Sequence, residues 1–291
     1  MASAGMDTSE KQLSLDTVVQ QIDEISSLPH IAVRVLSVAN DPNSGAADLR
    51  DLLETDASLS ARVLRVVNSS AYALRTKITN LQQSIAYLGL KQVRNLAMTA
   101  SVSELFAQND SFGTYSRSAL WRHLVSVGIC SRMIAEHLGF ANSEDVFLAG
   151  LLHDIGIILE DQSVHEEFSR VIETLEEGKT LSSTEMQHIG FDHTQLGEKV
   201  GELWGFPEGV DVTVRYHHAS ANYRGPHIAT LQCVEVANLL CTLKGITSVG
   251  MKLVRPSTAT LKKLSLSKQD LKIISDKLDE EIEANAALFQ V

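Results

Sequence analysis

The sequence predicts an all-α protein, a multi-helix bundle whose helices are joined by short connections. Apolar residues recur at steps of three and four along most of the chain, which is the period of a helix with one buried face. Strand signals are weak, because aromatic residues make up 5% of the chain and no Asn-Gly or Asp-Gly turn separates two alternating segments. With 291 residues, 44% of them apolar, the chain can bury one large core or two smaller ones.

Helix boundaries are predicted from capping residues along the chain. Residues 1–12 are small and polar and are expected to form a flexible leader. Ser44 is expected to cap the helix that follows it, and Ser143 is expected to cap one continuous helix over 144–160. Two further pairs have the spacing of a capping box at a helix start, namely Asp192 with Gln195 and Ser267 with Asp270.

Charge and cysteine usage restrict the class of protein. Lys and Arg number 25 against 36 Asp and Glu, and no cluster of basic residues stands out, so binding to nucleic acid through phosphates is disfavoured. The three cysteines lie in apolar runs without a CxxC pair, as buried cysteines in a reducing compartment do. No signal peptide and no run of roughly 20 apolar residues is present. We therefore expect a cytoplasmic protein that does not bind membranes.

Ten histidines are present, and seven of them lie between residues 153 and 227. His123 precedes this group and shares one predicted helix face with Leu120, Leu124 and Val127, so its ring is expected to point inward. A single buried histidine is most simply a core residue that is satisfied by one hydrogen bond. His123 alone therefore does not predict a ligand site.

His153 and Asp154 stand side by side in the apolar stretch EDVFLAGLLHDIGI, residues 144–157. Adjacent side chains on a helix diverge by about 100°, so both can reach one point only if it lies beside the helix. A metal ion fits that requirement, with an imidazole nitrogen from one residue and a carboxylate oxygen from the other. Gly150 and Gly156 flank the pair and allow another helix to approach closely. The alternative is a buried His-Asp hydrogen bond without a metal.

Three more histidines lie at predicted helix ends. His193 is in the first turn of a helix that ends at Gly205, so its ring is expected to point beyond the helix end. His217 and His218 are adjacent and follow the segment DVTVRY. Each of these positions suits either a ligand or an exposed side chain.

Taken in chain order, these residues resemble the metal-binding pattern of the HD superfamily of metal-dependent phosphohydrolases. The resemblance implies that the first histidine, the His-Asp pair and a distant aspartate hold one metal, and that further histidines hold a second metal with the aspartate of the pair as the bridge. Asn238 occupies the position of the distant aspartate, so an ion there would be bound by a neutral oxygen and more weakly. The implied ligands are His123, His153, Asp154, His193, His217, His218 and Asn238.

Mixed nitrogen and oxygen ligands without a thiolate suit divalent iron, manganese, nickel or zinc, as one or two ions. Without a metal, these buried polar side chains would need other partners, because burying them unpaired is costly. The sequence therefore favours a metal site but does not choose among the four metals.

The segment Leu28 to Met98 is similar to the N-terminal half of an HDOD domain, in its Leu-Pro start, its VLRVVNSSAY stretch and its SIAYLG segment. The similarity spans roughly residues 15–245. It implies an HDOD domain over 13–245, with an N-terminal half at 13–110 and an HD-like half at 111–245, followed by a helical extension at 246–291. HDOD domains are bacterial all-α modules of signalling systems and have no established general catalytic activity.

Two departures from the catalytic relatives decide between the functions that the resemblance allows. Phosphodiesterases of this superfamily that act on cyclic di-GMP carry a lysine after the His-Asp pair, where this chain has Ile157, and a Gly-Tyr-Pro signature that is absent from residues 217–226. We therefore expect a non-catalytic signalling module with a partly retained metal site. Its signalling protein partner and any small phosphorylated ligand cannot be named from the sequence. The alternatives are a metal-dependent phosphohydrolase, with Asp154 as the catalytic bridging residue, and a helical module without metal.

Overall fold

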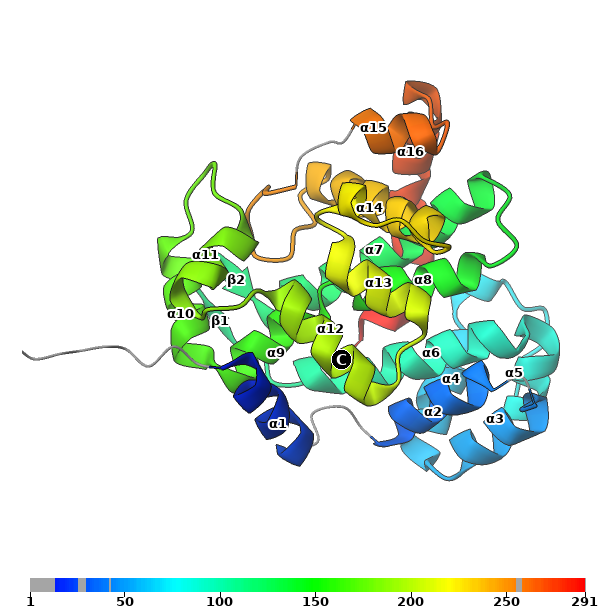
Figure 1. The fold of residues 1–291 in the computed structure, drawn as a ribbon. Coiled ribbons are helices and arrows are strands. Elements are labelled where there is room, and N and C mark those ends of the chain that lie inside the picture. Colours follow the sequence, from blue (N-terminus) through cyan, green and yellow to red (C-terminus); the bar gives the residue numbers. More distant parts are fainter. Residues whose placement is uncertain (1–13, 26–29, 42, 255–257, 291) are drawn as a thin grey trace, which may run out of the picture.

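The computed structural model describes residues 14–25, 30–41, 43–254 and 258–290 (Figure 1). The expected leader at residues 1–12 and the Leu-Pro start at 28–29 lie outside these residues. Helices make up most of the described chain, and the predicted all-α class is confirmed. One short antiparallel hairpin, β1 (Ser111–Phe112) with β2 (Tyr115–Ser116), is the only sheet in the described ranges.

The first half of the chain forms a lobe of short amphipathic helices (Figure 1). Helices α2 to α6 pack on one another around leucines and valines such as Leu49, Leu53, Val63 and Val67, which are fully buried. Helix α1 (Leu15–Ile25) leaves this lobe and packs against α9 and α12 of the second half. The lobe contains α2 (His30–Asn40), α3 (Ala46–Glu54), α4 (Ala57–Val67), the 3-10 turn η1 (Ser70–Tyr72), α5 (Leu81–Leu88), α6 (Leu90–Val102) and the turn η2 (Ser103–Phe106).

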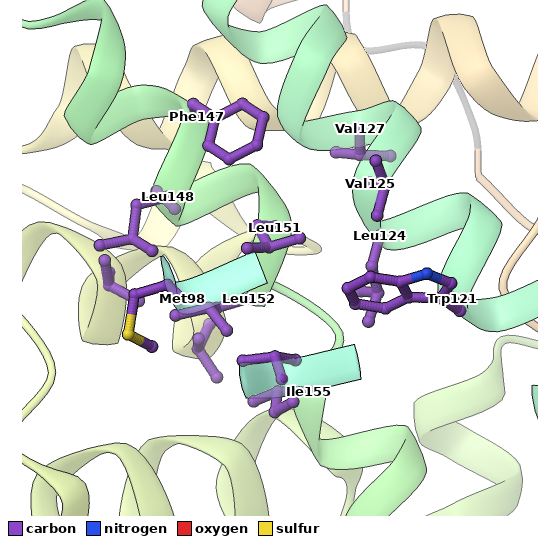
Figure 2. Packing of buried hydrophobic residues seen from close by; sticks show 14 of the residues in the cluster. Met98, Trp121, Leu124, Val125, Val127, Phe147, Leu148, Leu151, Leu152 and Ile155 are labelled. Carbon is purple, nitrogen blue, oxygen red and sulfur yellow. The ribbon is translucent and has the colours of Figure 1, made fainter. Parts of the chain in front are cut away.

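The second half is built around the long helix α7 (Arg117–His137), which packs against α8 and α14. Figure 2 shows the core at this contact, where Leu124 and Val127 of α7 face Leu151 and neighbouring residues of α8. The remaining helices of this half are α8 (Ser143–Leu152), α9 (Ile155–Ser163), α10 (His165–Thr174), α11 (Leu181–His188), α12 (His193–Trp204), α13 (Glu208–Tyr216), the turn η3 (Ser220–Asn222) and α14 (Ile228–Leu243).

The C-terminal helices return to the first half of the chain. After α15 (Thr258–Lys263), helix α16 (Lys268–Ala284) packs on α7, and the turn η4 (Ala286–Phe289) contacts α4, α6 and α7. Along the described chain, no helix has both the length and the apolar character needed to cross a bilayer.

The predicted caps are confirmed at two helices and wrong at two others. Asp192 with Gln195 and Ser267 with Asp270 form capping boxes at the starts of α12 and α16. Helix α3 is instead capped at Gly45, whose backbone N–H donates to Asp48 at 2.7 Å. Ser143 is the first residue of α8 and makes no capping hydrogen bond, because the preceding residue, Asn142, occupies the cap position.

The continuous helix expected over 144–160 is also wrong, because the chain turns at the His-Asp pair. Helix α8 ends at Leu152, and α9 begins at Ile155. Asp154 between them has φ −106° and ψ 21°, outside the helical region. The turn directs both side chains toward the same side, which a straight helix would not do.

Candidate metal centre

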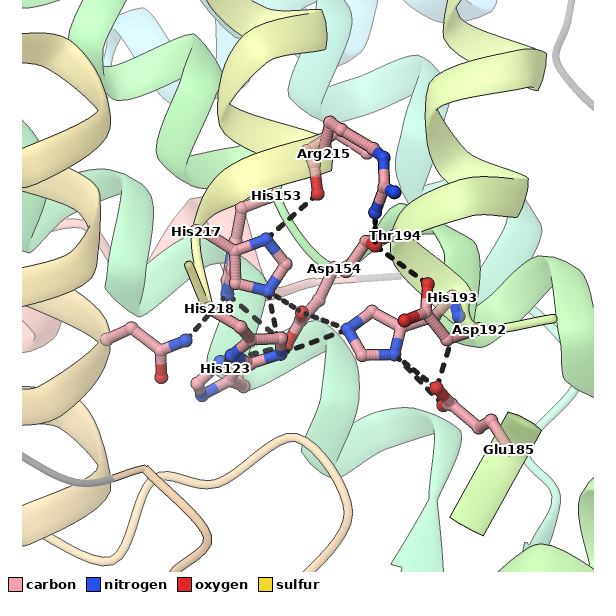
Figure 3. Close-up of polar contacts among 12 residues, drawn as sticks. His123, His153, Asp154, Glu185, Asp192, His193, Thr194, Arg215, His217 and His218 are labelled. Carbon is pink, nitrogen blue, oxygen red and sulfur yellow. Dashed lines mark hydrogen bonds and ion pairs between the residues drawn. The ribbon is translucent and has the colours of Figure 1, made fainter. Parts of the chain in front are cut away.

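The structure brings six of the predicted ligands into one buried cluster (Figure 3). His123 comes from the second turn of α7, His153 and Asp154 from the turn between α8 and α9, and His193 from the first position of α12. His217 and His218 follow α13, because that helix ends at Tyr216. All of these side chains are buried except that of His218, which is exposed at the rim of the cluster.

The carboxylate of Asp154 lies at the centre and presents a different oxygen to each side. Its Oδ2 is 3.5 Å from Nε2 of His123 and 3.3 Å from Nε2 of His153. Its Oδ1 is 3.0 Å from Nε2 of His217 and 3.5 Å from Nε2 of His193. Two sets of donor atoms therefore share one carboxylate.

His218 completes the set on the Oδ1 side. Its Nε2 lies 3.1 Å from Nε2 of His193 and 3.0 Å from Nε2 of His217. Within each of the two sets, one ligand atom from every residue lies within 4.8 Å of the others. Nitrogen ligands at about 2.0–2.1 Å from a tetrahedral ion are about 3.3 Å apart, so this spacing suits a transition-metal ion.

The outer nitrogen of each fully buried histidine is held by an oxygen that can only accept a hydrogen bond. Nδ1 of three rings therefore carries the proton and donates it to a backbone carbonyl, which leaves a lone pair on Nε2 inside the cluster. The three bonds run from His123 to Ile246 at 3.0 Å, from His153 to Gly150 at 2.8 Å and from His217 to Val214 at 3.0 Å.

His193 is held by a carboxylate in place of a carbonyl. Its Nδ1 donates to Glu185 Oε2 at 2.7 Å, and its backbone N–H donates to the same oxygen at 3.2 Å. Glu185 lies on α11 and is fully buried, as is Glu160 of α9 beside it. Burial, together with the neighbouring Glu185 carboxylate, raises the pKa of Glu160 well above its ordinary value, so Glu160 is the protonated partner of this pair.

The cluster also shifts the pKa values of its own members. Burial lowers the pKa of His193, but Glu185, Asp154 and Asp192 outweigh it and raise that pKa to about 9. Burial lowers the pKa of His217 and outweighs its contact with Asp154. Burial acts to raise the pKa of Asp154, but the surrounding histidines hold it well below its ordinary value. Asp154 is therefore an anion at neutral pH.

The contacts inside the cluster are unfavourable without a cation, because most of them bring two acceptor atoms together. Lone pairs of imidazole nitrogens face lone pairs of the Asp154 carboxylate at 3.0–3.5 Å, and acceptors that face each other repel unless a positive charge lies between them. His123 Nε2 and Asp154 Oδ1 are buried and have no hydrogen-bond partner among the described residues. Imidazole and carboxylate are suitable ligands for divalent transition metals, so a metal ion would satisfy both atoms.

Comparison with known proteins assigns the fold to a family. The model of the HDOD domain family matches residues 25–220. This chain belongs to the HDOD domain family. An HDOD domain protein of unknown function from Geobacter sulfurreducens has a crystal structure with a TM-score of 0.73, 30% identity and coverage of 94% of this chain and 98% of its own.

Two further crystal structures share the fold at lower identity. A protein from Shewanella amazonensis, named as a candidate phosphohydrolase, has a TM-score of 0.70 and 21% identity over 94% of this chain and 96% of its own. A candidate signal transduction protein from Marinobacter aquaeolei has a TM-score of 0.71 and 23% identity over 94% of this chain and 63% of its own. An uncharacterised relative from Treponema pallidum is 22% identical over 77% of this chain, which spans 43% of the length of that relative.

In this HDOD protein, Asn238 lies beside the histidine and aspartate cluster, and its amide nitrogen faces His153. Its Nδ2 is 3.3 Å from His153 Nε2, and its Oδ1 accepts a hydrogen bond from Thr242 at 3.4 Å. Asn238 is buried on α14. In this orientation it is a hydrogen-bond donor to His153, and as a metal ligand it would have to present its oxygen instead.

Sequence reasoning missed two buried glutamates, Glu185, which holds His193, and Glu160 beside it. Glu160 interrupts the buried apolar run of α9, and that position was a signal that could have been used. Glu185 lies in the polar segment STEMQH of α11, which has no feature that separates it from an exposed helix. Its role follows only from the packing of α11 beside the start of α12.

Proposed function

We propose that this HDOD protein is a bacterial signalling module that holds one or two divalent transition-metal ions in its histidine and aspartate cluster, without catalytic activity of its own. One observation carries the proposal. The Nε2 lone pairs of His123, His153 and His217 converge on the two oxygens of Asp154, and two of the buried atoms there have no hydrogen-bond partner among the described residues. A cation turns that repulsive arrangement into a stable one.

The two donor sets define which residues would hold each ion. His123, His153 and the Oδ2 oxygen of Asp154 form the first set. The second set consists of the Oδ1 oxygen of Asp154 with His193, His217 and His218. A bound ion would supply positive charge to the cluster. The protein keeps the rings in place through their outer Nδ1 bonds.

Burial of the cluster supports a structural or regulatory role for the ions. His123, His153, His193 and His217 are each at most 2% exposed, so a substrate would have to reach the centre from the side of His218. The lysine of related phosphodiesterases is replaced by Ile157, which is fully buried. The relative from Marinobacter aquaeolei is named as a candidate signal transduction protein, which agrees with a signalling role.

A metal-dependent phosphohydrolase is the second candidate, and the shared carboxylate favours it. Ions held by the two donor sets would supply Lewis acidity to a phosphate ester, and Asp154, which belongs to both sets, would then be the catalytic residue. The Shewanella amazonensis relative is named as a candidate phosphohydrolase. Turnover of a phosphodiester by the metal-loaded protein, lost in Asp154→Asn, would favour this function over the first.

Location and partner follow from the same proposal. The described cysteines, Cys130, Cys233 and Cys241, are buried and free, which suits a reducing cytoplasm. Because we propose no reaction, we propose that the module transmits its signal by binding to another signalling protein.

Elemental analysis of the purified protein, as metal per chain before and after chelation, tests the metal site. We expect one to two ions in the wild-type protein and none in the double variant His153→Ala with Asp154→Ala. The control is His227→Ala with Glu208→Ala, a histidine and a carboxylate that lie 3.4 Å apart outside the cluster. Full metal content in the first double variant, or no metal in the wild type after reconstitution, would refute the site.

A further inference from the structure

A concave groove lies on the N-terminal lobe, away from the histidine cluster. It has a volume of about 920 Å³ and is formed by the second half of α4, the turn η1 and the segment that leads to α5. Small-molecule sites have volumes of about 300–1,000 Å³, so this groove has the size of a ligand site. None of the proposed metal ligands lines it.

The groove lies in a strongly basic part of an acidic protein. Between Asp56 and Glu104 the chain has six basic residues and no acidic residue, although the whole chain has a net charge of −11. The expectation that no basic cluster stands out is therefore wrong for this segment. The six residues are Arg62, Arg65, Arg75, Lys77, Lys91 and Arg94.

Two of these cations line the groove and have no counter-charge. Arg65 and Lys77 are exposed, and neither forms an ion pair or a hydrogen bond with any described residue. Arg62 differs, because it pairs with Glu104 at 3.1 Å. Lys91 and Arg94 also differ, because both pair with Asp145. Among the six basic residues of this segment, the two that line the groove therefore keep a positive charge that no described carboxylate neutralises.

The loop that forms the wall is fixed in position. Asn68 holds it with both ends of its side chain, since its Nδ2 donates to Ile78 O at 2.9 Å and its Oδ1 accepts from Ile78 N at 2.9 Å. Ala73 in the same wall adopts a left-handed backbone with φ 44°, a conformation that non-glycine residues rarely adopt and that clusters at ligand sites. Ser69 Oγ is buried and has no hydrogen-bond partner among the described residues.

The lining also has an apolar part. Leu64 and Leu74 are half-buried, so each presents carbon surface to the groove beside the two cations. A ligand that contacts both parts has an anionic group and a planar or apolar group. Arginine and lysine together match a phosphate, and leucine side chains suit the face of a base.

We propose that this groove binds a small phosphorylated molecule with the chemistry of a nucleotide. Its phosphates lie against Arg65 and Lys77, and its apolar part lies against Leu64 and Leu74. The concave shape favours a small molecule over an extended polyanion, which the net charge of −11 would repel over most of the surface. The site is separate from the metal centre, so the two proposals can fail independently.

Titration calorimetry with ATP and with pyrophosphate tests the groove in the full chain. We expect saturable binding of ATP, weaker binding of pyrophosphate, and a Kd for ATP that rises at least about tenfold in Arg65→Gln with Lys77→Gln, because two charge-assisted contacts are lost. The control is Lys262→Gln with Lys263→Gln, which removes the same charge from two exposed lysines of α15 and should leave the Kd unchanged.

The metal-site variant separates this groove from the histidine cluster. ATP binding should persist in His153→Ala with Asp154→Ala, because those residues lie outside the groove. Loss of ATP binding in that variant would place the phosphates at the metal centre and overturn the proposal. Absence of ATP binding in the wild type, equal binding of ATP and pyrophosphate, or an unchanged Kd in Arg65→Gln with Lys77→Gln would each overturn it as well.

Discussion

Each buried histidine of the cluster uses its two ring nitrogens for different partners. Nδ1 donates to an oxygen of the protein, and Nε2 faces the Asp154 carboxylate. The outer bond fixes both the tautomer and the rotation of the ring, so the inner lone pair is oriented before any ion arrives. The strength of ion binding therefore depends on residues that never contact the ion.

Glu185 is the residue for which this dependence is expected to be largest. Replacing it in Glu185→Gln keeps the size of the side chain but removes the negative charge that holds Nδ1 of His193. Changes of this kind lower metal affinity by about 10- to 100-fold. We expect that loss in a competition titration with a chromophoric chelator.

Glu173→Gln is the control, because Glu173 is exposed on the neighbouring helix α10. It removes the same charge without touching the cluster, so its metal affinity should equal that of the wild type. Equal affinities in Glu185→Gln and Glu173→Gln would show that Glu185 does not support the site.

Asn238 gives a second prediction for single residues. Replacing it with aspartate adds an anion beside His153, where the amide nitrogen now lies at 3.3 Å. If Asn238 takes part in binding, Asn238→Asp should tighten metal binding at least about tenfold, since anionic oxygens bind divalent ions more strongly than neutral ones. The same competition titration measures this change, and an unchanged affinity would remove Asn238 from the set of ligands.

At the scale of elements, the turn between α8 and α9 brings the His153 and Asp154 side chains into the same cluster. The apolar period of residues 144–157 predicted helix, and that part is confirmed on both sides of the turn. The turn itself could not be predicted from periodicity, because neither His153 nor Asp154 is a helix breaker. Its geometry depends on a tertiary contact, the close approach of α12 to Gly156, together with the local bond from His153 Nδ1 to Gly150 O.

Gly156 sets the distance between α9 and α12. A Cβ at this position would collide with the backbone carbonyl of His193, which cannot move without displacing the start of α12. We expect Gly156→Ala to lower the free energy of unfolding by roughly 1–3 kcal/mol, as overpacked cores do. Chemical denaturation measures this change, and elemental analysis should show reduced metal content. A variant with wild-type stability and metal content would contradict the predicted collision.

At the scale of the whole molecule, the two halves are joined by polar contacts between α6 and α8. Asn95 Nδ2 donates to the backbone oxygen of Glu144 at 2.7 Å, and Arg94 donates to Asp145 at 3.1 Å. These contacts lie at the start of α8, and the other end of this helix leads to His153. The N-terminal lobe is thus connected to the cluster through α8, and the turn η2 adds contacts with α7 and α9.

Arg94 and Lys91 test this connection as a matched pair, because both contact Asp145. Arg94 is 2% exposed, whereas the Lys91 side chain is 52% exposed. We expect Arg94→Met to lower the free energy of unfolding by about 1–3 kcal/mol, because it leaves buried polar partners unsatisfied. Lys91→Met should lower it by less than about 1 kcal/mol. Urea unfolding of both variants measures the difference, and equal effects would argue against a buried junction.

The pH dependence of stability has a predicted contribution from Asp211 on α13. Burial, with Glu202 and Glu198 nearby, raises the pKa of Asp211 to about 7. In the unfolded chain its pKa is about 3.9. The folded state therefore binds the proton more tightly than the unfolded state does. The stabilisation that Asp211 contributes is complete below pH of about 4 and is lost as the pH rises through 7.

We expect Asp211→Asn to reduce the fall in denaturation midpoint between pH 5 and pH 8, because asparagine stays neutral across that range. Urea unfolding of the wild type and the variant at both pH values measures the difference. The same pH dependence in both proteins would show that Asp211 ionises as freely in the folded state as in the unfolded one.

The order of helices and the choice of inward-facing histidines were open to prediction from the sequence. His123 lies on a strongly apolar face, and His193 follows a recognisable cap, so their placement is local information. The partners of the outer nitrogens could not be predicted, because Ile246 O and Glu185 come from segments far away in the chain. The groove at Arg65 could not be predicted either, because its concave shape depends on how the segment after α4 folds back and not on the spacing of apolar residues.

The donors of the cluster span residues 123 to 218 and come from separate helices of the second half. Both donor sets are complete only when this whole stretch is present. An unfolded or nascent chain therefore has no preformed site for the ions. In the metal-binding module that we propose, ion capture would therefore follow folding of the second half. Under that proposal, a chain synthesised without metal would fold with the carboxylate and its rings opposed, and the ion would later enter a protein that is already folded.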